Sequence, residues 1–111
     1  MLAGAHDLFD FDDWMQRIDD GSQNLQRHID ARDVPAARDA AREIESLYTL
    51  MQQFFDQRAG AGDAVRWSRE GRQFAQRIQA DLAARRFAAA KRNALAIAHG
   101  CRDCHLSYKP L

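Results

Sequence analysis

The spacing of apolar residues is the feature that most constrains this 111-residue chain, because they recur every three or four positions along almost its whole length. Such spacing places one side of an α-helix in a core. The first apolar stripe consists of Leu8, Phe11, Met15, Ile18, Ser22, Leu25 and Ile29. Ser22 is its one polar member, and the stripe fails at Arg32 and Asp33. Pro35 follows at a position that suits the first turn of a second helix.

Three further stripes predict three further helices. The second stripe consists of Ala37, Ala41, Ile44, Leu47 or Tyr48, Met51, Phe54 and Phe55. It ends at the Gly-Ala-Gly segment 60–62, which suits a turn, and Asp63 is the expected N-cap of the next helix. The third stripe consists of Trp67, Gly71, Phe74, Ile78 and Leu82. After a break at 85–86, the last stripe consists of Phe87, Ala90, Ala94, Ile97, Cys101, Cys104 and Tyr108.

Composition supports this prediction of an all-α fold. Alanine, arginine, leucine and glutamine are abundant in the chain, whereas β-branched residues are scarce. Four helices with short links favour an antiparallel up-down-up-down four-helix bundle. We therefore expect residues 1–111 to form a single domain of this kind, without strands.

A Cys-x-x-Cys-His motif, residues 101–105, lies near the end of the fourth stripe and contains both cysteines of the chain. This motif attaches c-type haem: Cys101 and Cys104 would add to the vinyl groups, and His105 would ligate iron. A zinc site would need a second pair of ligands, but the remaining histidines are isolated. A thioredoxin-like redox motif would follow a strand. The motif therefore predicts one covalently bound haem c per chain, near the C-terminal end of the fourth helix.

Met15 is the predicted second axial ligand. It lies about two turns into the first helix and His105 a similar distance from the end of the fourth, so helix rise places them at nearly one level. Ligation by methionine and histidine raises the reduction potential toward that of an electron carrier. The alternative is a core methionine beside an open iron site. We assign Met51 to packing and His99 to the surface.

Large aromatic residues cluster at the end of the predicted bundle that holds the motif. They are Phe9, Phe11, Trp14, Phe54, Phe55, Trp67, Phe74 and Tyr108. The opposite end carries mainly alanine and aliphatic residues, with Phe87 as the exception. This distribution predicts that the haem lies among the aromatic side chains.

Charge and hydropathy limit the partners. Lysine plus arginine equals aspartate plus glutamate, so there is no basic excess for binding nucleic acid. The apolar runs are far too short to span a bilayer, which predicts a soluble protein without membrane insertion. Thioether attachment of haem implies a compartment outside the cytoplasm, usually the periplasm. We therefore expect a secretory signal in a precursor, although the given chain shows none.

The motif on the last helix, followed by Tyr108 and Lys109, resembles the cytochrome c′ family, the class II c-type cytochromes. The resemblance implies that Lys109 lies close to the proximal histidine and that Met15 faces the distal side. Low-spin members have a ligating methionine there and carry electrons. High-spin members leave iron five-coordinate and bind nitric oxide or carbon monoxide. Methionine also occurs at this position without ligating, so Met15 alone does not decide the branch, and we expect the low-spin one.

The chain departs from the family in one residue that concerns the haem. The family often has an arginine near a haem propionate four residues before the distal position, and this chain has Phe11 there. The negative charge of the propionates must then be neutralised or hydrated by another group, with Arg17 or water as candidates. The chain is also shorter than is usual for the family, and we expect this difference to lie in shorter loops between the helices.

These observations predict one-electron transfer between redox protein partners, not an enzyme. The alternatives are a gas-binding haem protein of the same fold, or a haem domain of a larger sensor or redox enzyme. Family members often dimerise through the outer faces of the first two helices, so a homodimer is among the states that the resemblance allows.

Overall fold

The computed structural model describes residues 8–107, with side chains described for 10–102. This part of the chain forms four helices and no strand: α1 (Leu8–Asp30), α2 (Val34–Asp56), α3 (Gly62–Ala83) and α4 (Phe87–Ser107). The all-α class and the four helices predicted from apolar spacing are therefore confirmed for the described residues. None of these helices is both long enough and apolar enough to cross a membrane.

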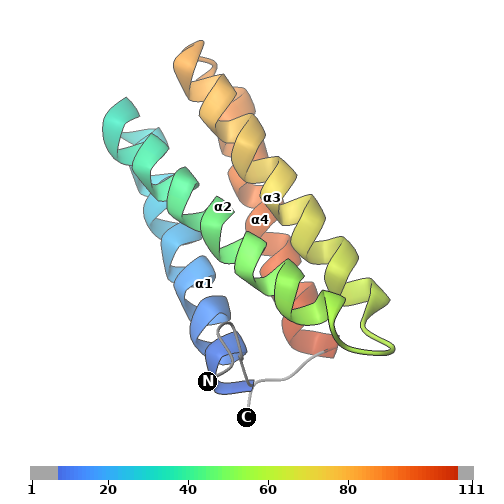
Figure 1. Cartoon of the computed structure of the whole chain (residues 1–111). Coiled ribbons are helices and arrows are strands. Elements are labelled where there is room, and N and C mark those ends of the chain that lie inside the picture. Colours follow the sequence, from blue (N-terminus) through green and yellow to red (C-terminus); the bar gives the residue numbers. More distant parts are fainter. Residues whose placement is uncertain (1–7, 108–111) are drawn as a thin grey trace, which may run out of the picture.

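Each helix packs against two others. Helices α1 and α3 both contact α2 and α4. In Figure 1 the α1–α2 and α3–α4 links lie at one end of the molecule, and the α2–α3 link lies at the other. The start of α1 and the end of α4 also lie at this second end. We call the first the Phe87 end and the second the Gly60 end, after a residue in or beside each set of links.

The core follows the predicted stripes in three of the four helices. Every member of the first two stripes that the structure describes is buried, from Phe11 to Ile29 and from Ala37 to Phe55. In α4, Ala90, Ala94 and Ile97 are also buried, whereas Phe87 and Cys101 are half-buried. Small side chains let neighbouring helices approach closely, so the alanines bring the helices together near the Phe87 end.

The buried side of helix α3 differs from the side that the third stripe predicts. Gly71, Ile78 and Leu82 are buried as expected, but Trp67 and Phe74 are only half-buried. The residues that enter the core instead are Ala64, Ser68, Ala75 and Asp81. The prediction that Trp67 and Phe74 face the core was therefore wrong in part, because small residues occupy the closest contacts and the rings lie at the edge.

The two links at the Phe87 end share one backbone feature. Arg32 and Arg85 both have left-handed backbone conformations, with φ of 56° and 58°. Their guanidinium carbons lie 4.9 Å and 5.2 Å from the centroid of the Phe87 ring. Asp33 caps α2 by accepting a hydrogen bond of 3.2 Å from the Ala36 amide. A turn with arginine in place of glycine is thus accompanied by cation–π contacts with one shared ring.

The α2–α3 link corrects one predicted cap. Gly60 has φ of 78°, as a turn there requires. However, α3 begins at Gly62, its N-cap is Ala61, and no side chain caps it. Asp63 was predicted to be this N-cap and instead lies inside the first turn, where it pairs with Arg66 at 3.3 Å. A carboxylate there still interacts favourably with the helix dipole.

Polar contacts connect neighbouring helices near the Phe87 end. Lys91 of α4 donates to both carboxylate oxygens of Asp30 on α1, at 2.9 and 2.8 Å. Asn93 of α4 donates to Asp81 of α3 at 2.9 Å. These contacts join α4 to both of its neighbours.

Candidate functional site

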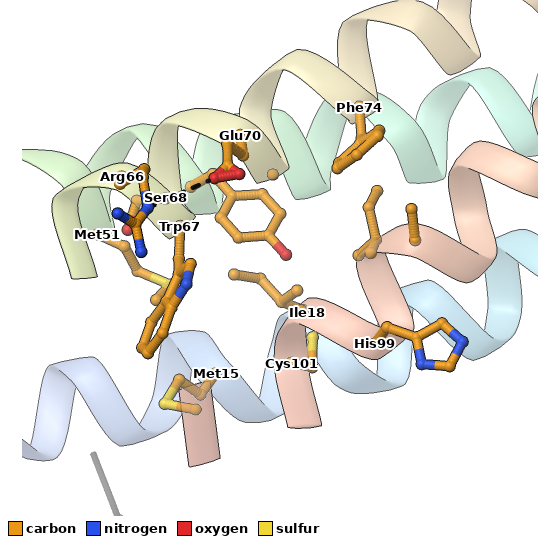
Figure 2. Close-up of a pocket in the computed structure, with 15 residues that line it drawn as sticks. Met15, Ile18, Met51, Arg66, Trp67, Ser68, Glu70, Phe74, His99 and Cys101 are labelled. Atoms are coloured by element: carbon orange, nitrogen blue, oxygen red, sulfur yellow. Dashed lines mark ion pairs between the residues drawn. The ribbon is translucent and has the colours of Figure 1, made fainter. Parts of the chain in front are cut away.

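A cavity of about 420 Å³ lies within the bundle and is lined by all four helices (Figure 2). Helix α1 contributes Met15 and Ile18, and α4 contributes Ile97 and Cys101. The volume falls within the range of about 300–1,000 Å³ that is typical of small-molecule and cofactor sites. The cavity therefore has the size of a ligand site and includes the first cysteine of the motif.

Helices α2 and α3 form the opposite wall. Tyr48 and Met51 of α2 line the cavity together with Trp67, Gly71 and Phe74 of α3. The Tyr48 ring lies against Gly71, where a Cβ atom would come within 2.3 Å of Tyr48 Cζ. Gly71 thus leaves the space that the Tyr48 ring fills, and the absence of a side chain there shapes this wall.

Three exposed residues mark where the cavity meets solvent. Arg66 and Glu70 lie on α3, and His99 lies on α4. Arg66 Nε lies 3.8 Å from Glu70 Oε1, the contact drawn as a dashed line in Figure 2. The exposed residues among the described lining side chains thus all lie on α3 and α4, which pack on each other, and we call the side of the cavity that they share its mouth.

Met15 and Cys101 reach the cavity from neighbouring helices. Met15 is 4% exposed, and Cys101 is half-buried. Helices α1 and α4 pack on each other, so the thioether and the thiol belong to one side of the cavity. In Figure 2 Trp67 extends from α3 toward the part of the cavity where Met15 lies. The structure therefore brings two of the predicted site residues to one cavity.

The remaining predicted site residues lie beyond the described side chains. The backbone of Cys104 and His105 belongs to α4, three and four residues after Cys101, which is about one helical turn. Their side chains are outside the described part, and Tyr108 and Lys109 are outside it altogether. The predictions for Cys104, His105 and Lys109 thus stay predictions.

The predicted aromatic cluster divides into two groups. Phe11 and Trp14 of α1 pack against Phe54 and Phe55 of α2, with ring centroids 5.0 to 5.9 Å apart. These four rings join α1 to α2 and do not line the cavity. Among the described aromatic residues, Tyr48, Trp67 and Phe74 line it, and Phe9 and Tyr108 lie outside the described side chains. The prediction that the aromatic cluster as a whole surrounds the site was therefore too broad.

Several cavity residues were missed or misassigned from the sequence. Met51 was assigned to packing and His99 to the surface, yet both line the cavity, although His99 is exposed as expected. Tyr48 and Ser68 were not singled out as site residues, and Ser68 donates to the Ala64 carbonyl at 2.8 Å. Gly71 was assigned only to the third stripe, because the sequence does not show that it faces the Tyr48 ring on α2.

The lining suits a large apolar group with few polar contacts. Aliphatic, aromatic and sulfur-containing side chains form most of the wall, and the charged ones lie at the mouth. A thiol and a thioether are the groups that a covalently attached, iron-containing macrocycle would require from this part of the chain. Among the described side chains, no three His, Cys, Asp or Glu residues are grouped so that they could hold a metal ion by themselves.

Comparison with known proteins places this chain in no group: no family model, no curated protein and no solved structure matches it.

Proposed function

We propose that this chain is a c-type cytochrome that transfers single electrons between redox protein partners. The proposal rests above all on one observation: the internal cavity is lined by Cys101, the first residue of the Cys-x-x-Cys-His motif, and by Met15 on the neighbouring helix. Haem c would be held through Cys101 and Cys104, near the C-terminal end of α4. The bundle would be the antiparallel, up-down-up-down type, and the position of the motif on the last helix resembles the cytochrome c′ family.

The proposed axial ligands are His105 and Met15. Helical continuity supports the first, because α4 runs from Phe87 to Ser107 and includes the entire motif. Burial in the cavity wall supports the second, since the Met15 side chain is almost fully excluded from solvent. A bound haem supplies reversible one-electron oxidation and reduction of its iron. Lys109 would lie close to the proximal histidine, as the family resemblance implies.

The chain's own residues would keep the site dry and in place. Ile18, Ile97 and Phe74 present apolar surface to the cavity, and Trp67 covers it from α3. An apolar surrounding strengthens the electrostatic effect of any charge held nearby, because the local dielectric constant is low. We place this protein outside the cytoplasm, where thioether attachment takes place, and treat it as a non-enzymatic carrier.

The decisive experiment compares two methionines in one cavity. Met15 and Met51 are both 4% exposed and both line it. The protein would be produced in cells able to mature c-type cytochromes, and visible spectra of the oxidised and reduced forms would be recorded before and after carbon monoxide. We expect a low-spin spectrum, including the weak sulfur-to-iron band of the oxidised form, that carbon monoxide leaves unchanged.

The variants distinguish ligation from packing. Met15→Leu should give a high-spin spectrum that shifts with carbon monoxide, whereas Met51→Leu should leave the spectrum as in the parent. A parent protein that is already high-spin and shifts with carbon monoxide would replace electron transfer by the gas-binding function. Absence of haem absorbance from maturation-competent cells would overturn the proposal as a whole.

A further inference from the structure

The charged residues at the mouth of the cavity suggest how the cofactor is oriented. Among the described residues that line the cavity, Arg66 is the one lysine or arginine. Glu70 lies beside it on α3, and His99 on α4 also lines the cavity, with its ring directed away from the other labelled side chains in Figure 2. Among the described side chains, the deeper part of the wall carries no charged group, so a charged portion of a ligand is best accommodated at this mouth.

Haem carries such a charged portion. Its two propionate carboxylates lie on the part of the ring away from the vinyl groups that thioether bonds would fix to α4. A carboxylate is costly to bury and needs water or a cationic partner. Arginine suits this role because its planar guanidinium can donate two hydrogen bonds to one carboxylate.

Arg66 is held loosely enough to accept a new partner. Its Nη2 lies 3.3 Å from Asp63 Oδ1 and its Nε 3.8 Å from Glu70 Oε1. The Arg66 side chain is 56% exposed. Ion pairs of this length between exposed groups contribute little to stability. Both contacts are to residues one turn away on α3, so they hold the guanidinium beside the mouth without binding it tightly.

Arg17, the candidate from the sequence, is placed less well. Its Nε pairs with Asp13 at 3.2 Å, one turn earlier on α1, and both side chains are 59% exposed. Arg17 does not line the cavity. The expectation that Arg17 meets the propionate charge therefore has no support from the geometry.

We propose that Arg66 is the cation that neutralises the haem propionates, and that these carboxylates leave the cavity at the mouth between α3 and α4. This inference rests on the proposed function and assigns one residue of this chain, on α3, the role that the family often gives to an arginine on the first helix. It also identifies the α3–α4 boundary as the side on which the cofactor approaches solvent.

The test is a redox titration of the haem-loaded protein and three variants. Arg66→Gln removes the charge, Arg66→Lys keeps it, and Arg69→Gln removes another exposed charge from α3 that does not line the cavity. Loss of a cation beside the propionates stabilises the oxidised form, so Arg66→Gln should lower the reduction potential. At a fixed applied potential, the ratio of reduced to oxidised protein should fall severalfold.

The pH dependence of the potential gives a second readout. In Arg66→Gln, the pH at which the reduction potential begins to change should move upward, because carboxylates without a neighbouring cation keep their protons to higher pH. Arg66→Lys should restore most of both properties, and Arg69→Gln should resemble the parent. Equal changes in Arg66→Gln and Arg69→Gln would overturn the inference while haem binding stands. Absence of bound haem in the parent, visible before any titration, would overturn the inference together with the proposed function.

Discussion

The ring of Tyr48 on α2 lies directly over the backbone of Gly71 on α3, so that a Cβ atom added at Gly71 would sit 2.3 to 2.6 Å from three ring atoms. Both residues are buried, and the ring is rigid. Gly71→Ala should therefore destabilise the protein although alanine favours helix. We expect a loss of about 1–3 kcal/mol in the free energy of unfolding, measured by denaturant titration.

Gly21→Ala is the matched control. A Cβ there would lie 3.4 and 3.6 Å from two Ile44 side-chain atoms, which is close to ordinary contact. The helix preference for alanine should then make the change neutral or stabilising by up to about 1 kcal/mol. Equal effects of the two substitutions would show that Tyr48 moves aside easily.

Ser22 and Ser68 are two fully enclosed serines with different hydrogen bonding. Ser22 Oγ has no hydrogen-bond partner in the described part of the chain, whereas Ser68 Oγ donates to the Ala64 carbonyl at 2.8 Å. Ser22→Ala removes a desolvated hydroxyl and should stabilise the protein by about 1 kcal/mol. Ser68→Ala loses a hydrogen bond and should be less favourable than Ser22→Ala. Thermal unfolding of both variants in parallel measures this order. The reverse order would show that a buried water satisfies Ser22.

Arg85 has a left-handed backbone conformation, with φ of 58°. Such a conformation costs a residue with a side chain about 1–2 kcal/mol, whereas glycine adopts it freely. Arg85→Gly should thus gain from the backbone and lose only the exposed contact with Phe87, and the net change should be small. Arg85→Val keeps the strain and adds β-branching, so it should destabilise clearly. Similar melting temperatures for the two variants would contradict this.

Asp81 is a largely buried carboxylate that accepts hydrogen bonds from two side chains. Asn93 Nδ2 donates to Oδ2 at 2.9 Å, and Arg86 Nε donates to Oδ1 at 3.2 Å. Asn93→Ala would remove the partner of Oδ2 and should cost about 1–3 kcal/mol. Asn24→Ala, on the exposed surface of α1, should change stability by less than about 0.5 kcal/mol. Urea unfolding of both proteins would reveal whether water replaces Asn93 without loss.

The sequence was most informative where the apolar stripe was continuous. In α1 and α2 the large apolar residues themselves occupy the core positions, so their spacing gave the buried side directly. Pro35 at the start of α2 was likewise recognisable, because proline suits the first turn of a helix. Strong periodicity thus predicted both the helices and their orientation.

Helix α3 shows where this reasoning fails. Ser68 and Ala75 are buried as deeply as Ile78 and Leu82 but carry weak hydrophobic signals, whereas Trp67 and Phe74 are only half-buried. A stripe traced through the largest residues is therefore rotated from the true one. The helix begins at Gly62 without a side-chain cap, so Asp63 gave a misleading signal for its start.

The candidate site was only partly accessible to sequence reasoning. Cys101 and Met15 were identified by motif and by helix rise, and the structure places both at one cavity. Tyr48, Met51 and Arg66 could not be assigned to it, because their roles depend on how α2 and α3 face each other. Nothing in their own sequence spacing separates a cavity wall from an ordinary core.

The ring of helices also implies an order of assembly. Three of the packed pairs, α1–α2, α2–α3 and α3–α4, join helices that follow each other in the sequence. The fourth pair, α1–α4, joins the first helix to the last. Forming the α1–α4 pair closes the longest loop and therefore has the greatest cost in conformational entropy. Contacts distant in sequence also tend to form late in folding. Met15 and Cys101 lie on these two helices. The side of the cavity that holds them is thus formed by the α1–α4 contact, which we expect to form last during folding and to break first during unfolding.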